Sequence, residues 1–291
     1  MLIGAGNRVE FINLAKRAAS DLAIDLRIIS VEFSERVPIA SKASVVSTPL
    51  QFRSVEFSEF LTDRFSGDNF LVLPFMDSSV DAIYEAKSNF KSPVGEDSVR
   101  VLDKAYLKSL CEKISISVPR NVSSGSAHVR PIFGNGGIGI SKTELSGSGL
   151  LNHQTFLYEE LLTGPEVSLD VYVFLDGTYS AIARDRLRIV GGEVQHTKTR
   201  DTSEIERDIL EKLMASLELR GPLNIQLMGE EPRLLEINPR FGGGSTASIH
   251  AGWNAPNWLL QEYLLGRTLS ETSPVFNHVE VVRAWKDYIW R

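Results

Sequence analysis

Apolar residues follow two different spacings in the first third of the chain. The segments Leu26–Val31 and Phe70–Phe75 are short apolar runs of the kind that form buried strands. The segments Val9–Ser20 and Ser54–Phe65 instead place apolar residues three or four positions apart, which predicts helices. Because such strands and helices alternate, we predict a parallel sheet with crossover helices over residues 1–97.

The rest of the chain predicts separate helices and strand hairpins. Helical spacing runs over Ser98–Lys113, Thr202–Leu219 and Trp253–Leu265. The segments Gly221–Met228 and Arg233–Asn238 have the pattern of two antiparallel strands joined by a hairpin turn. The expected fold class is therefore an α/β part followed by α+β parts.

A strand, a turn at Gly164–Pro165 and a second strand follow one another in the middle of the sequence. In the second strand Glu166, Ser168 and Asp170 alternate with apolar residues, so we expect these polar side chains to point away from the core. The preceding extended segment, residues 159–162, offers an apolar slot and backbone hydrogen bonds of the kind that an adenine ring needs.

The strongest chemical pattern lies near the C-terminal end of the chain. Leu234, Leu235 and Ile237 can face a core while Glu236 and Asn238 project from the other side of the strand. A carboxylate and an amide oxygen two residues apart suit a hard divalent cation such as Mg²⁺, with Mn²⁺ as a substitute. Residues 236 and 238 therefore predict a metal site.

The neighbours of this oxygen pair extend the pattern. Pro239 ends the strand, and Arg240 follows as a cation suited to phosphate oxygens. The hairpin places Gln226 opposite Glu236, which makes it a candidate third oxygen ligand. The glycine run Gly242–Ser245 either approaches a phosphate through its backbone N–H groups or merely turns the chain.

A second glycine-rich loop runs from Gly134 to Gly139 and follows a cation, Arg130. Such a loop can fold over phosphates, although Asn-Gly is also a strong hairpin signal and no Gly-Lys-Ser/Thr follows it. Lys104 and Lys108 share one face of the predicted helix, which is ordinary for solvated lysines unless a phosphate lies opposite.

Other polar residues have weaker assignments. Arg184 and Arg186 share one side of a strand and are either surface charge or a pocket for an anion. Gly4 and Gly6 do not complete a dinucleotide fingerprint, because Val9 stands where the third glycine belongs. The turn after Gly6 offers Asn7 and Arg8 to an acidic ligand, and Asp77 is either a helix cap or a ligand contact.

Composition narrows the classes of function. A net charge of −6 and a pI near 5.5 give no whole-molecule attraction to nucleic acid or an anionic membrane. The single cysteine, Cys111, excludes an internal disulfide and falls in a helical pattern that predicts a buried structural thiol. We find no apolar run near the length that spans a bilayer and no signal peptide, so a cytoplasmic protein is the expectation.

Taken in chain order, these motifs resemble the ATP-grasp superfamily, and most of all its single-module members related to the large subunit of carbamoyl phosphate synthase. The resemblance rests on Asp103-Lys104 at a helix start, the glycine loop, Glu159-Glu-Leu-Leu-Thr-Gly-Pro-Glu166, Gln226 and Glu236-Ile-Asn-Pro-Arg240. It implies a Rossmann-like pre-ATP-grasp domain over 1–97, a trimmed small subdomain over 98–158 and a C-terminal subdomain with the metal site over 159–291.

The resemblance also implies roles for individual residues. ATP would be held by residues of four regions: the lysine face of the helix, the glycine loop with the arginine before it, the extended segment 159–162, called the hinge below, and a ribose contact. These residues are Lys104, Lys108, Arg130, Gly134, Asn135, Gly136, Gly137, Glu159, Glu160, Leu161, Leu162 and Glu166. Mg²⁺ would be held by Gln226, Glu236 and Asn238. The transferring phosphoryl group would be stabilised by Arg240 together with Arg184 or Arg186.

The implied activity is an ATP- and Mg²⁺-dependent ligase that joins a small carboxylate, such as an amino acid, to an amine or a thiol through an acyl phosphate. Neither nucleic acid nor a membrane is an expected partner, and a homodimer is an open option. Arg130 in place of the usual lysine and the short stretch before it favour one alternative, a non-catalytic or regulatory ATP-binding protein. An NAD-binding Rossmann enzyme is the other alternative.

Overall fold

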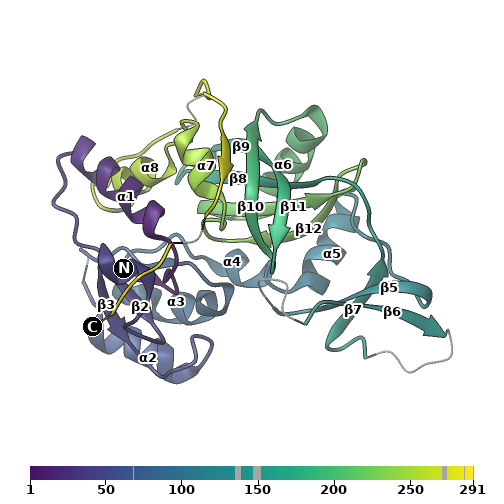
Figure 1. The fold of residues 1–291 in the computed structure, drawn as a ribbon, viewed down its shortest axis with the longest axis horizontal. Helices are drawn as coiled ribbons and strands as arrows, with labels where there is room; N and C mark the ends of the chain where they lie inside the picture. Colours follow the sequence, from purple (N-terminus) through teal and green to yellow (C-terminus); the bar gives the residue numbers. More distant parts are fainter. Residues whose placement is uncertain (68, 135–138, 147–151, 271–273, 285, 291) are drawn as a thin grey trace.

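The computed structural model describes residues 1–67, 69–134, 139–146, 152–270, 274–284 and 286–290. Its strands form a four-stranded, a six-stranded and a three-stranded sheet (Figure 1). None of the helices in these residues is long and apolar enough to cross a membrane.

The four-stranded sheet belongs to the N-terminal part of the chain and is parallel throughout, as the sequence predicts. Helices alternate with its strands along the chain because each parallel connection needs a crossover. In spatial order the strands are β3 (Ser44–Ser47), β2 (Ile29–Glu32), β1 (Leu2–Ile3) and β4 (Leu73–Pro74), and the helices in chain order are α1 (Val9–Asp21), α2 (Val55–Arg64) and α3 (Val80–Ala86).

The single helix predicted over Ser98–Lys113 is wrong, because the structure has two helices there. The first, α4, spans Glu96–Arg100, and the second, α5, spans Lys104–Lys113. Asp103 starts the second helix, since its carboxylate accepts hydrogen bonds from the backbone N–H groups of Ala105 and Tyr106 at 2.8 and 2.9 Å. Apolar spacing continued across the break and hid it.

The small sheet is antiparallel, with spatial order β6 (Ser141–Ser146), β5 (Ser124–Pro131) and β7 (Phe156–Glu160). In Figure 1 it lies at the end of the molecule away from the N-terminal sheet. Strand β7 continues through position 158, where the sequence analysis separates two subdomains, so Glu159 and Glu160 pair with the small sheet.

The six-stranded sheet is antiparallel and carries most of the C-terminal half. Its spatial order is β12 (Arg233–Asn238), β11 (Gly221–Met228), β8 (Glu166–Val173), β9 (Tyr179–Val190), β10 (Glu193–Arg200) and β13 (Glu280–Val282). Helix α6 (Glu204–Ser216) buries Ile209, Leu210 and Leu213 in one core with inward residues of this sheet.

The N-terminal sheet and the large sheet share a second core. Phe11 from α1 and Phe75 beyond β4 pack against Phe241, with ring centroids 4.6 and 6.0 Å away. Trp253 and Trp258 extend this core along α7 (Ser245–His250) and α8 (Ala255–Tyr263), which lie beside α1 in Figure 1. The carboxyl edge of the parallel sheet is thereby held against the C-terminal half.

Candidate functional site

Strand β12 does not alternate regularly, and this irregularity shapes the site. Gln226 pairs with Glu236 while Leu227 pairs with Leu234, so Leu235 is an extra residue in a β-bulge. The bulge lets Leu234 remain buried, at 2% exposure, although strict alternation would put it on the same face as Glu236. The expectation that Leu235 also faces the core is not met, because it is half-buried.

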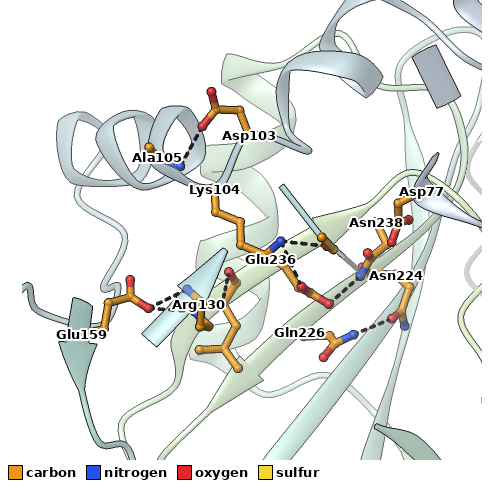
Figure 2. A network of polar contacts seen from close by, with 12 residues as sticks. Asp77, Asp103, Lys104, Ala105, Arg130, Glu159, Asn224, Gln226, Glu236 and Asn238 are labelled. Carbon is orange, nitrogen blue, oxygen red and sulfur yellow. Dashed lines mark hydrogen bonds and ion pairs between the residues drawn. The ribbon is translucent and has the colours of Figure 1, made fainter. Parts of the chain in front are cut away.

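The residues predicted as metal ligands lie together on β11 and β12 (Figure 2). The Nδ2 group of Asn238 donates to Glu236 Oε1 at 3.1 Å, and the predicted pairing of Gln226 with Glu236 is confirmed by the strand register. The side chain of Gln226 is turned to another partner, because its Oε1 accepts from Arg186 at 2.7 Å. The predicted third ligand is therefore engaged with a cation.

The donor set fits a hard cation that brings further ligands with it. Glu236 Oε2 accepts no hydrogen bond within the described residues, and its closest cation, the ammonium of Lys104, is 4.0 Å away. The described chain contains no group of three His, Cys, Asp or Glu residues suited to a metal ion. One carboxylate and nearby amide oxygens suit Mg²⁺ bound jointly with phosphates, which supply the remaining oxygens.

Lys104 stands at the start of α5 between two pockets. One pocket is lined by Lys104, Asp77, Gly134, Glu236 and Asn238. The ammonium of Lys104 donates to the carbonyl of Gly134 at 2.9 Å, which ties the base of the glycine loop to the start of α5. Burial and the nearby positive charges of Arg130 and Arg53 lower the pKa of Lys104, against the opposite effect of Glu236 and Asp77.

The second pocket lies on the other side of Lys104 and is lined by apolar residues and a buried charge cluster. Leu107 and Leu234 contribute apolar surface. Arg130 and Lys108 both bind the carboxylate of Glu159, at 2.7 and 3.1 Å, and Glu159 is 1% exposed. Figure 2 shows Arg130 between this carboxylate and β12, where it also donates to the carbonyl of Leu235 at 3.2 Å.

Lys108 is placed differently from Lys104, although both lie on one helix face as predicted. Its ammonium donates to the carbonyl of Pro119, to Asn121 Oδ1 and to Glu159 Oε1. An ammonium has three N–H donors, so all donors of Lys108 are used inside the protein.

The predicted hinge residues differ in what their side chains do. Glu160 pairs with Arg120 and Arg233, and its hydrogen bond with Arg120 lowers the pKa of Glu160 to about 2. Leu161 is exposed and Leu162 half-buried, and within the described residues no backbone hydrogen bond engages either. Three of the residues predicted to bind ATP, Asn135, Gly136 and Gly137 of the glycine loop, lie outside the described residues.

Arg184 and Arg186 lie on one side of β9, as their spacing predicts, but in different surroundings. Arg186 pairs with Glu166 at 3.0 Å and also binds Gln226, which is one of the predicted metal ligands. Arg184 is 1% exposed and pairs with Asp170 at 3.1 Å. The Glu166 carboxylate predicted to hold a ribose is thus already paired with a guanidinium.

Asp170 is a residue whose role the sequence pattern misses. Ser168 and Asp170 do not belong to the core that holds Leu169, in line with the predicted alternation, but both are buried, which the alternation does not predict. The carboxylate of Asp170 accepts from Asn224 at 2.9 Å, from Ser245 at 2.8 Å and from Ser248 at 2.6 Å, in addition to Arg184. These contacts anchor the start of α7, so Gly242–Ser245 turns the chain into a helix that the sequence analysis did not predict.

Arg240 connects the end of β12 to the N-terminal sheet. Its guanidinium binds the carboxylate of Asp77 through two hydrogen bonds, at 2.6 and 2.9 Å, and reaches Asn238 Oδ1 at 3.3 Å. Burial alone would lower the pKa of Arg240, but the contact with Asp77 outweighs it and raises the pKa. Asp77 follows β4, at the carboxyl edge where ligands of parallel sheets gather.

Comparisons with known proteins bear on the family and the fold of the chain. Residues 152–286 match the family model described as ATP-grasp in the biosynthetic pathway with Ter operon. The matched residues make up slightly less than half of the chain and are similar to this ATP-grasp family. The resemblance predicted from the motifs is thereby confirmed, and no curated protein matches the sequence.

Solved structures share the ATP-grasp fold over almost the whole chain. The biotin carboxylase domain of 2-oxoglutarate carboxylase from Hydrogenobacter thermophilus, solved with MgADP and bicarbonate, has a TM-score of 0.72 and 12% identity, over 95% of this chain and 72% of that one. N5-carboxyaminoimidazole ribonucleotide synthetase from Thermus thermophilus has a TM-score of 0.66 and 17% identity, over 94% and 80%.

L-amino acid ligase from Bacillus licheniformis has a TM-score of 0.65 and 15% identity, over 92% of this chain and 74% of that one. At these identities the likeness concerns the ATP-grasp fold.

Proposed function

We propose that this chain is an ATP- and Mg²⁺-dependent ligase that activates a small carboxylic acid as an acyl phosphate and joins it to an amine or a thiol. The observation that carries the proposal is the pair of pockets that meet at Lys104, one with Glu236 and Asn238 and the other with apolar residues beside the charge cluster of Glu159. This arrangement offers separate places for a base and for a triphosphate with its cation.

The nucleotide would lie along both pockets. Leu107 and Leu234 would contact the adenine ring, and the unengaged backbone of Leu161 and Leu162 would bind its edge. Lys104 would bind phosphate oxygens, because its ammonium lies 4.0 Å from the carboxylate of Glu236, where the cation would bind. We assign Lys108 and Arg130 to the support of this wall, since both are held by Glu159.

The chemistry needs little from the protein beyond positioning and charge. An oxygen of the substrate carboxylate bonds to the γ-phosphorus while the bond to ADP breaks, and the nucleophile then displaces phosphate from the acyl carbon and loses a proton. Mg²⁺ held by Glu236 and Asn238 would supply charge neutralisation. Arg240 and Arg186 flank that pair and would stabilise charge on the transferred group.

The acid substrate would lie between the metal strand and the N-terminal sheet. Asp77 follows β4, and Arg8 immediately precedes α1. Asp77 contacts Arg240 and Arg8 contacts Gly243, both of which lie just past β12. We therefore propose that the N-terminal sheet is the pre-ATP-grasp domain of this chain and contributes to acid recognition. The relatives with similar structures include an amino acid ligase, which supports an amino acid or a similar small acid.

ADP release tests the proposal. The protein is incubated with ATP, Mg²⁺ and a panel of acid and amine pairs, and ADP formation above the background without acid is expected for at least one class of acid. Glu236→Ala should abolish acid-dependent ADP release, whereas Glu230→Ala, in the exposed turn of the same hairpin, should retain it. Unchanged turnover in Glu236→Ala would overturn the proposed metal site.

Two alternatives give different results in the same experiment. ATP binding without ADP release on any pair would favour a regulatory ATP-binding protein, the alternative that Arg130 and its engagement with Glu159 support. Binding of NAD(H) without ATP binding would favour a dinucleotide enzyme and contradict both. A homodimer stays a prediction, which light scattering of the purified chain checks.

A further inference from the structure

Two arginines from opposite ends of the chain converge next to the glycine turn beyond β12. Arg8 immediately precedes α1, and Arg283 immediately follows β13. Both guanidinium groups donate to the carbonyl of Gly243, Arg8 from 3.4 Å. Each guanidinium carries about five N–H donors, so a single carbonyl oxygen satisfies only a small part of this pair.

The acidic partner of both arginines is Glu193, the first residue of β10. Its carboxylate lies 3.3 Å from Arg8 and 3.7 Å from Arg283. Burial would raise the pKa of Glu193, but Arg8, Arg283 and Arg240 together outweigh that effect and lower it. Glu193 nevertheless keeps 57% of its side-chain surface exposed, and it follows a turn in which Gly191 and Gly192 have φ of 58° and 79°.

Positive charge exceeds negative charge around this turn. Arg240 is paired with Asp77 and Arg184 with Asp170, which leaves Arg8 and Arg283 to share Glu193. Burial, together with repulsion from Arg8 and Arg184, lowers the pKa of Arg283 to about 10, although Glu193 opposes the change.

One buried donor here also lacks a partner. The Nη1 group of Arg184 makes no hydrogen bond to any residue that the structure describes, and the Arg184 side chain is buried. A side chain on Gly244 would meet this atom at 2.2 Å, so only glycine leaves it room. The excess of cations around Glu193 points to an anion as the missing partner of Arg8 and Arg283.

We propose that Arg8 and Arg283 bind a second anionic group of the acid substrate, a carboxylate or a phosphate, and that Glu193 occupies this position until the substrate displaces it. The inference rests on the proposed function and narrows its substrate to acids with two anionic groups. Glu193 can leave because it is largely exposed and follows a glycine turn.

The second group is distinct from the carboxylate that reacts. The reacting carboxylate must lie by the metal strand, next to Arg240, which contacts Asn238. The arginine pair is attached to Gly243, three residues further along the chain, and three residues span at most about 10 Å. A small acid with two anionic groups a few bonds apart covers such a separation.

Anion binding in the absence of ATP tests the inference independently of catalysis. Isothermal titration with inorganic phosphate, and separately with succinate, is carried out on the wild type, Glu193→Gln and Arg283→Gln. Glu193→Gln should bind the preferred anion roughly tenfold more tightly, the factor of one charge-assisted hydrogen bond, and Arg283→Gln should bind it at least tenfold less tightly. Arg100→Gln, whose guanidinium pairs with Asp97 on α4, is the control and should bind as the wild type does.

Turnover then distinguishes this inference from the proposed function. The acid panel contains matched monocarboxylic, dicarboxylic and phosphate-bearing acids, and acids of one dianionic class should release ADP with the lower KM. Arg8→Gln and Arg283→Gln should raise the KM for that acid at least tenfold while the KM for ATP stays unchanged.

Equal KM values for monoanionic and dianionic acids, unaffected by these variants, would overturn the second-anion site without contradicting the proposed ligase activity. Absence of ATP binding would overturn the ligase, whereas phosphate or succinate binding with the expected variant effects would still support the anion site.

Discussion

The site contains two clusters of similar composition on either side of β12, each with a glutamate and a cation from the same face of α5. Around Glu236 the contacts are loose, with Lys104 at 4.0 Å and one carboxylate oxygen without a hydrogen bond in the described chain. Around Glu159 they are complete, with Lys108 and Arg130 both bound and the carboxylate 1% exposed. Both clusters contain a glutamate and a lysine of α5. They differ in how many of their donors and acceptors already form hydrogen bonds within the protein.

This difference predicts which cluster binds a ligand and which cluster stabilises the fold. A charge with unused hydrogen-bonding capacity beside a pocket can exchange its partners for a ligand at low cost. A buried charge whose partners are complete cannot, because removal of one partner leaves the others unsatisfied in a medium of low polarity. The cluster around Glu236 is therefore expected to govern ligand binding, and the cluster around Glu159 to govern stability.

The largest expected effect comes from exchanging the two glutamates for glutamine. Glu159→Gln should lower the free energy of unfolding by about 3–5 kcal/mol, because it leaves two buried cations without their counter-charge. Glu236→Gln should change it by less than about 1 kcal/mol, since its carboxylate is partly exposed. Urea unfolding of both variants measures the contrast, and equal losses would refute the distinction between the clusters.

A smaller effect, on ADP affinity, is expected when pH changes the charge of the cluster around Glu236, called the open cluster below. Because the pKa of Lys104 is lowered, its ammonium loses its proton below the usual range for lysine as pH rises. ADP affinity should therefore fall about tenfold between pH 7 and pH 10, the loss of one charge-assisted hydrogen bond. The unfolded chain holds this proton more tightly, so this group adds to the stability of the wild type as pH rises through the same range.

The variant Lys104→Arg provides the control for that titration. Arginine stays charged throughout, so neither change with pH should survive in the variant. Fluorescence titration with ADP measures the affinity. A pH dependence that is identical in the two proteins would assign the effect to another group.

The smallest effect is expected where the open cluster is given one more charge. Gln226 lies opposite Glu236, so Gln226→Glu would place a second carboxylate at the metal position. Mn²⁺ affinity without nucleotide should rise by roughly a factor of ten or less, because Arg186 competes for the new carboxylate. Electron paramagnetic resonance counts free Mn²⁺, and Gln51→Glu on the surface is the matched control. An unchanged affinity would show that position 226 does not contact the cation.

Much of this fold follows from local patterns in the sequence. The parallel N-terminal sheet, the pairing of Gln226 with Glu236 and the shared side of Arg184 and Arg186 all depend on periodicity and short-range order. The break before α5 could have been recognised from Asp103, which is a good helix cap, but the apolar spacing on both sides concealed it.

Other features depend on contacts that no local pattern records. The bulge at Leu235 appears only when β12 is set against β11, because a single strand does not reveal where its partner skips a residue. The burial of Asp170 depends on Ser245 and Ser248, which lie far along the chain. The arginine pair at Gly243 joins residues from both ends of the sequence, so neither Arg8 nor Arg283 carries a signal of its partner.

The bridge between Asp77 and Arg240 has a consequence for biosynthesis. These residues are separated by 163 positions, so at ordinary translation rates Arg240 is made roughly 10–30 s after Asp77. The parallel sheet can form during that interval, with an uncompensated carboxylate at its edge and without Phe241 to cover Phe11 and Phe75. A nascent chain therefore exposes this edge to the surrounding proteins before it can bind any substrate.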